Sequence, residues 1–145
     1  MDADRRVLFF GDSFVAGVGD PTGRGWIGRV VAASFDAGLP LVAYNLGVRR
    51  ETSVAVAARW RDEARPRMSA QATHGVVFSF GVNDATPENG RLRVEPDDTV
   101  GALGRVLDGA HELALPALVV GPAPAGEPAQ NVRVGALSAA FARVA

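Results

Sequence analysis

The chain alternates four short apolar segments with longer segments of helical periodicity, and this alternation restricts the fold more than any other feature. The apolar segments are VLFF (7–10), LVAYNLG (41–47), GVVFSFG (75–81) and ALVVG (117–121). Each is a continuous run rich in β-branched and aromatic residues, which is typical of a strand buried on both faces. We therefore expect four strands of a parallel sheet.

The segments between these runs are expected to be helices. Apolar residues recur at intervals of three and four in 26–35, and Thr52 or Ser53 can cap a helix that continues to Arg65, before Pro66. A third helix is predicted to start near Pro96 to Thr99, and 130–145 is predicted to be a fourth. Strands that alternate with helices indicate right-handed crossovers in an α/β fold. A length of 145 residues fits one domain.

Composition and charge exclude several classes of protein. The chain is 48% hydrophobic, with 15 basic and 16 acidic residues, so neither disorder nor nucleic-acid binding is expected. Cysteine is absent, which excludes disulfides and thiolate chemistry. Only four apolar residues follow MDADRR, too few for a signal-peptide core, and no run approaches the ~20 residues of a membrane span. We expect a cytoplasmic protein with no membrane partner, metal or cofactor.

Polar and glycine residues follow the first three predicted strands. These residues are Gly11-Asp12-Ser13, Asn45-Leu46-Gly47 and Gly81-Val82-Asn83-Asp84. In an open parallel sheet, ligands bind outside the carboxyl ends of the strands, so these groups are expected to converge there. A serine hydroxyl, glycine amides and a carboxamide are the parts of an acyl-transfer site.

Each of these features also has a purely structural explanation. Ser13 can cap the helix after the first strand, Gly47 can be a turn residue, and Asn83 with Asp84 can form an Asx turn. Their occurrence at three successive strand ends favours a functional site.

Three motifs, in order along the chain, resemble those of the GDSL or SGNH hydrolases. FFGDSF resembles the Gly-Asp-Ser block, YNLG followed by VRRETS resembles the glycine block, and FGVND matches the Gly-x-Asn-Asp block. The resemblance implies a three-layer α/β/α, flavodoxin-like sandwich with strand order 2-1-3-4-5. It also implies Ser13 as nucleophile and an oxyanion hole from the N–H groups of Ser13 and Gly47 with the Asn83 carboxamide. Asp12 and Asp84 are then structural acceptors.

The chain departs from the family pattern after the glycine block. Many members have another glycine there, where this chain has Arg49, Arg50 and Glu51, so the substrate pocket is expected to differ.

The histidine that would act as base is not evident. The family's Asp-x-x-His block has a match in the string DGAH, Asp108 to His111. A crossover helix runs antiparallel to the strands, however, so His111 belongs at the amino edge of the sheet, roughly 17 Å from Ser13. A base must lie within ~2.6 to 3.2 Å of the proton it removes. His74 precedes the third strand and is also expected at the amino edge.

We therefore expect residues 1–145 to form a single SGNH-hydrolase domain that lacks the fifth strand and the Asp-x-x-His block. The complete polypeptide is expected to continue past Ala145, and the 145 residues alone are expected to be a poor catalyst. The uncovered fourth strand favours self-association.

The function favoured by these observations is a serine esterase, lipase or acylhydrolase that cleaves a small ester or thioester through an acyl-enzyme on Ser13. Two alternatives stay open. One is a non-catalytic, flavodoxin-like module that binds phosphate or nucleotide at the same strand ends, with Gly11 to Gly19 as its loop. The other is an inactive, truncated hydrolase.

Overall fold

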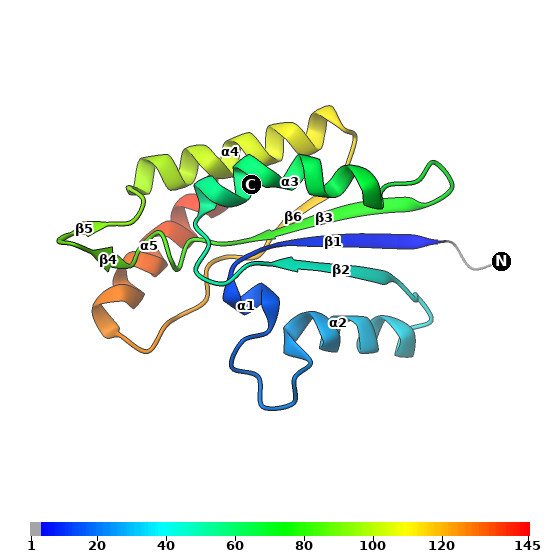
Figure 1. Cartoon of the computed structure of the whole chain (residues 1–145), viewed down its shortest axis with the longest axis horizontal. Helices are drawn as coiled ribbons and strands as arrows, with labels where there is room; N and C mark the ends of the chain where they lie inside the picture. Colours follow the sequence, from blue (N-terminus) through cyan, green and yellow to red (C-terminus); the bar gives the residue numbers. More distant parts are fainter. Residues whose placement is uncertain (1–3) are drawn as a thin grey trace.

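The computed structural model describes residues 4–145 and contains a four-stranded parallel sheet with helices on both faces (Figure 1). The sheet strands are β1 (Arg5–Gly11), β2 (Val42–Gly47), β3 (Thr73–Ser79) and β6 (Ala117–Val119). They lie side by side in the order β2-β1-β3-β6, and every pairing is parallel. This arrangement confirms the expected order, with the first strand in the interior of the sheet and the fourth predicted strand at one edge.

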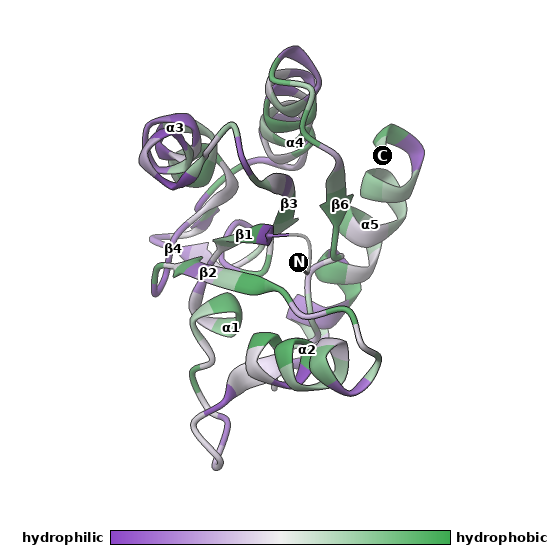
Figure 2. Cartoon of the chain, turned by 90° about the vertical axis from the view of Figure 1, so that its right-hand side faces the viewer, coloured by the Kyte–Doolittle hydropathy of each residue, from purple (hydrophilic) through white to green (hydrophobic). Residues whose placement is uncertain are grey.

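Helices cover both faces of the sheet, as Figure 2 shows. One face carries α3 (Ser53–Ala64) and α4 (Pro96–Glu112), and the other carries α1 (Ser13–Ala16) and α2 (Gly25–Asp36). The last helix, α5 (Pro128–Val144), lies beside β6 and packs against α4. The four predicted helices are thus present. A helix does follow the first strand, α1, but its cap is Asp12 and not Ser13. The short 3₁₀ helix η1 (Arg65–Arg67) and the hairpin of β4 (Pro87–Glu88) and β5 (Arg91–Leu92) were not expected.

The alternation of side chains along β1 explains why helices cover both faces. Leu8 and Phe10 point into one core cluster with Trp60 of α3, whereas Phe9 points into a second cluster with Val15 and Ile27. Successive residues of a strand face opposite sides of the sheet, so a strand that is apolar throughout requires a partner on each side. The continuous apolar run therefore dictates the three layers.

Two strands end earlier than the apolar runs that predicted them. The third run extends to Gly81, but β3 ends at Ser79, opposite Gly11, the last residue of β1. Gly81 itself has φ of 118°, outside the range of a strand. The fourth run was expected to reach Gly121, but β6 ends at Val119. The early end of β3 leaves Asn83 and Asp84 in a loop that is free of the sheet ladder.

This loop is anchored by α5. Its apolar residues Val82 and Ala85 pack against Val134 and Leu137 in a small separate cluster. The side-chain Nε2 of Gln130 donates to the carbonyl of Val82 over 2.9 Å. The C-terminal helix thus fixes the segment that carries Asn83.

No helix in the part of the chain that the structure describes is long and apolar enough to cross a membrane.

Candidate active site

Ser13 is the first residue of α1 and follows directly on the carboxyl end of β1. Asp12 caps this helix, because its Oδ1 accepts a hydrogen bond of 2.9 Å from the amide of Phe14. The N–H of a first helical residue has no partner within its own helix. The strand and its cap therefore present a partly exposed hydroxyl and a backbone donor at the same residue.

Asp12 itself is almost completely buried, with 3% of its surface exposed. Burial raises its pKa from 3.8 to about 6, against the opposing effect of the hydrogen bond from Phe14. The nearby carboxylates of Asp84 and Glu51 raise it further. The residue before Ser13 is thus an acceptor that holds α1 in place, in agreement with the structural role expected for it.

Gly47 is the last residue of β2, so Asn45, Leu46 and Gly47 lie within the strand, whereas they were expected to follow it. Gly47 lies opposite Gly11 in the sheet register and against α1. A Cβ at this position would be 2.3 Å from the Ala16 nitrogen and 2.8 Å from the Asp12 carbonyl oxygen. Only glycine permits such an approach. The amide of Gly47 donates to Oδ1 of Asn45 over 3.1 Å, so this expected oxyanion donor already has a partner within the chain.

Asn83 extends its carboxamide toward the loop after β2. Its Nδ2 donates to the main-chain carbonyl of Glu51 over 2.9 Å. An amide nitrogen carries two hydrogens, so the second N–H of Asn83 is not used by this contact.

Asp84, the next residue, is completely buried and joins two helices to the loop. Its carboxylate accepts from the amide of Ser53 at 3.0 Å and from the Ser53 hydroxyl, both at the start of α3. It also accepts from the Thr99 hydroxyl of α4 at 3.1 Å. These contacts make Asp84 a structural acceptor, as expected, and hold its neighbour Asn83 at the carboxyl edge of the sheet.

Arg59 of α3 completes the framework of the loop after β2. Its guanidinium donates to the Glu51 carboxylate, to Glu63 and to the carbonyl of Leu46. This residue could not be recognised from the sequence, because an arginine in the polar stretch of an amphipathic helix gives no signal of its own. Only the fold reveals that its partners flank Gly47 and Asn83.

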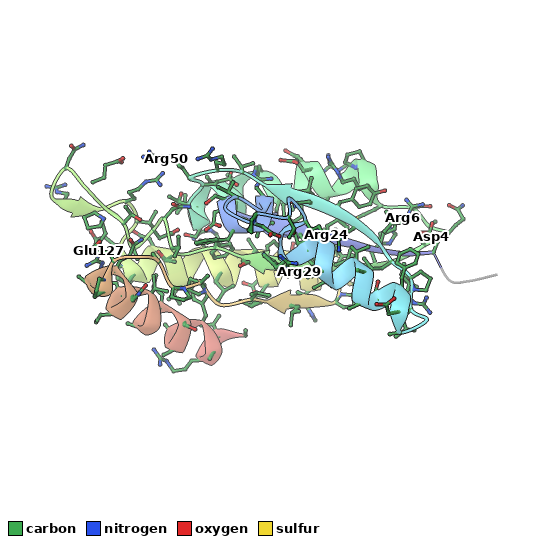
Figure 3. All side chains as sticks on the ribbon, turned by 90° about the horizontal axis from the view of Figure 1, so that it is seen from below. Asp4, Arg6, Arg24, Arg29, Arg50 and Glu127 are labelled. Atoms are coloured by element: carbon green, nitrogen blue, oxygen red, sulfur yellow. The ribbon has the colours of Figure 1, made fainter. Side chains whose placement is uncertain are left out.

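Arg50 stands where the sequence departs from the family pattern, and its backbone is unusual. Its φ is 64°, in the left-handed region that favours glycine. Its side chain is 75% exposed and lies 3.4 Å from Glu88 of β4. Figure 3 shows Arg50 toward the carboxyl ends of the strands, whereas Asp4 and Arg6 lie at the opposite end of the molecule.

An open cleft of about 340 Å³ lies beside α1. The exposed apolar side chains of Phe14 and Val18 form part of it, and the ion pair of Asp20 with Arg29 borders it. Its complete lining is Phe14, Gly17, Val18, Asp20, Pro21, Gly25, Trp26 and Arg29. The residue after Ser13 therefore belongs to an apolar hollow that can accommodate part of a small ligand.

Both histidines of the chain lie far from Ser13. The β1–β3 register pairs His74 with Arg6 and pairs Ser79 with Gly11, so His74 is about 17 Å of strand away from the carboxyl edge. His74 Nε2 accepts from the Ser69 amide at 3.1 Å. His111 lies in the last turn of α4, shortly before β6 begins. Among residues 4–145, no group of three or more His, Asp or Glu side chains is placed to hold a metal ion.

Comparisons with known proteins agree with the motifs and the fold. The model of the GDSL-like Lipase/Acylhydrolase family matches residues 9–145. Among curated protein sequences no match is found. Solved structures with the same fold include AlinE4, described as an SGNH-hydrolase family esterase, with a TM-score of 0.71 and 23% identity. That comparison covers 98% of this chain and 75% of the esterase.

Two further structures are similar over nearly the whole chain. An alpha/beta hydrolase enzyme from the metagenome of Lake Arreo, Spain, has a TM-score of 0.78 and 19% identity, covering 99% of this chain and 73% of that one. The acetylxylan esterase Axe2 from Geobacillus stearothermophilus has a TM-score of 0.76 and 17% identity. That comparison covers 99% of this chain and 74% of the esterase. At these identities the likeness shows a shared fold.

Proposed function

We propose, from the premise that this chain belongs to the GDSL-like lipase/acylhydrolase family and is a hydrolase of ester bonds, that Ser13 is its nucleophile. The Ser13 Oγ attacks the ester carbonyl and gives up its proton to the base, the bond to the leaving alcohol breaks, and the alcohol departs with that proton while the acyl group stays on the serine. Water then cleaves the acyl-enzyme and restores the hydroxyl. The observation that carries this proposal is the position of Ser13, at the start of α1 and at the carboxyl edge of the sheet.

The oxyanion in this proposal is stabilised by backbone and side-chain donors at that edge. The N–H of Ser13 and the second N–H of Asn83 are the principal donors. The amide of Gly47 joins them only when it exchanges Asn45 Oδ1 for the oxyanion, so it is the weakest of the three.

The substrate proposed here is a small ester or thioester. The cleft beside Phe14 is open and has an apolar wall, which suits a short acyl or aryl group. Its size of about 340 Å³ is small for a long lipid chain.

The base that activates Ser13 is, in this proposal, a group supplied from outside residues 1–145. The positions of His74 and His111 at the amino edge of the sheet support this part of the proposal. The oxyanion hole and substrate binding alone provide roughly 10³ to 10⁴ over the uncatalysed rate in serine proteases that lack their triad.

The proposal is tested by the steady-state hydrolysis of p-nitrophenyl acetate. In the complete polypeptide, which supplies the base, Ser13→Ala is expected to abolish the protein-dependent rate, and Asn83→Ala to lower kcat by roughly 10² to 10³. Ser79→Ala is the matched control, because Ser79 ends the neighbouring strand opposite Gly11 and has no part in the proposed chemistry. Equal rates for wild type and Ser13→Ala would show that Ser13 is not the nucleophile.

A further inference from the structure

Arg59 joins both ends of the loop that follows β2. Its Nη2 donates to the carbonyl of Leu46 over 2.7 Å, immediately before Gly47. Its Nε donates to Oε1 and Oε2 of Glu51 over 2.8 and 2.9 Å, at the other end of the loop. A planar guanidinium with several fixed donors can hold two such acceptors at once.

The ion pair of Arg59 with Glu51 is well shielded from solvent. The two side chains are 19% and 10% exposed, and the Arg59 guanidinium carbon lies 5.6 Å from the centre of the Phe10 ring. Nη1 is occupied by Glu63 at 2.8 Å, one turn further along α3. These contacts fix the Arg59 guanidinium on several sides, so it can hold the loop after β2 in one position.

The loop itself is a tight turn with an unfavourable backbone conformation. The Glu51 amide donates to the Val48 carbonyl over 3.3 Å, and the intervening Arg50 has a left-handed backbone. A non-glycine residue in this region costs free energy and persists only where its surroundings impose it. The bonds from Arg59 to Leu46 and Glu51 provide such a constraint.

The position of Glu51 decides how the Asn83 carboxamide is oriented. A main-chain carbonyl accepts hydrogen bonds and does not donate, so it selects Nδ2 over Oδ1 of Asn83. If Glu51 shifts, the carboxamide is released to rotate and can present its oxygen where a donor is needed.

We infer that Arg59 is a positioning residue for the oxyanion hole, because it holds Glu51 where the Glu51 carbonyl orients Asn83. This inference rests on the proposed function, since it assigns Asn83 the role of oxyanion donor. Arg59 acts through Glu51 and does not itself contact the substrate.

The test combines kinetics with a measurement that requires no turnover. The chain has four asparagines, so the side-chain amide signals of ¹⁵N-labelled protein are few, and loss of a signal in Asn83→Asp identifies Asn83. The variants are Arg59→Gln and the more conservative Arg59→Lys. Arg61→Gln is the matched control, because Arg61 lies on the same helix as Arg59 but pairs with Glu112 of α4 and has no contact with the loop.

In Arg59→Gln, we expect a shift of the Asn83 side-chain signals and a fall in kcat for p-nitrophenyl acetate of roughly 10- to 100-fold, with KM changed less than about threefold. Arg59→Lys keeps the charge but loses the forked donors of the guanidinium. Its Asn83 signals and its kcat should therefore lie between those of Arg59→Gln and those of wild type. Arg61→Gln should leave the signals and kcat at wild-type values.

Unchanged Asn83 signals in folded Arg59→Gln or Arg59→Lys would overturn the inference. So would a kcat no lower than that of Arg61→Gln in an enzyme whose activity depends on Ser13. If Ser13→Ala is as active as wild type, the proposed function fails, and the Asn83 signals alone then decide whether Arg59 orients this side chain.

Discussion

Gly47 and Ala16 lie so close together that a Cβ on the glycine would be 2.3 Å from the Ala16 nitrogen. The contact joins the end of β2 to α1, the helix that begins with Ser13. Gly47 thus sets how closely the end of β2 approaches α1, the helix that carries Ser13.

Gly47→Ala is therefore expected to destabilise the protein by about 1–3 kcal/mol, because backbone atoms must move to admit the methyl group. Chemical denaturation measures this change. Gly104→Ala is the control: Gly104 lies within α4 with open space around its Cα, and the same substitution should stabilise the helix there by about 0.5–1 kcal/mol. Equal effects at the two sites would contradict the tight contact.

The buried carboxylate of Asp84 should be sensitive to the loss of any donor. Thr99→Val removes the hydroxyl that donates to it over 3.1 Å, and we expect a loss of about 1.5–3 kcal/mol in the free energy of unfolding. Thr22→Val removes a hydroxyl that donates to Asp20 over 2.9 Å at the exposed surface. That control should change stability by less than about 0.5 kcal/mol. A free energy of unfolding that is unchanged in Thr99→Val would show that Asp84 is not held as described.

The end of α4 offers a stabilising substitution. Ala114 has φ of 51°, and the bonds from Leu115 to Ala110 and from Ala114 to His111 form a Schellman motif, in which glycine is preferred at this position. Ala114→Gly should raise stability by about 0.5–1 kcal/mol, visible as a higher Tm. Ala139→Gly, at an exposed site within α5, should lower it by a similar amount. A lower Tm for Ala114→Gly would contradict the assignment.

Asp12 should give stability a distinctive pH dependence. Burial raises its pKa to about 6 in the folded chain, whereas the unfolded carboxyl titrates near 3.8. The folded state therefore binds the proton more tightly than the unfolded state does. The stability that Asp12 contributes through this proton is present below about pH 4 and is lost as the pH rises through about 6.

Asp12→Asn keeps an acceptor for the Phe14 amide but cannot ionise. Between pH 4 and pH 7, the free energy of unfolding of Asp12→Asn relative to wild type should rise by up to about 3 kcal/mol. Urea denaturation across this range measures the difference. A difference that does not change with pH would show that Asp12 titrates normally.

The strands, their order and the edge that carries Ser13 could be predicted, because they depend on local patterns. Continuous apolar runs indicate strands buried on both faces, and parallel connections leave few arrangements. The bounds of α1 and the β4–β5 hairpin could not be predicted, because a helix of four residues and strands of two residues carry no periodicity.

The finer arrangement of the site depends on contacts between distant segments. Three contacts of the site form only when the chain is folded. They are the bond from the Gly47 amide to Asn45, the bond from Asn83 to Glu51 and the bonds from Arg59 to both ends of the loop. Residue types at strand ends indicate which groups gather there. They do not indicate which donors are already satisfied.

The nucleophilic role of Ser13 is tested most directly by mass spectrometry of the chain after brief incubation with p-nitrophenyl acetate and acid quenching. The chain contains no lysine, so background acetylation of side-chain amines is absent. The p-nitrophenolate leaving group departs readily, so acylation of Ser13 needs a base less than deacylation does. Because neither histidine is near to assist deacylation, an acetyl group should accumulate on the peptide that contains Ser13, in wild type and in Ser79→Ala. It should be absent from Ser13→Ala. Acetylation of a different residue with Ser13 unmodified, or no acetylation in a chain that hydrolyses the ester, would contradict the proposed chemistry.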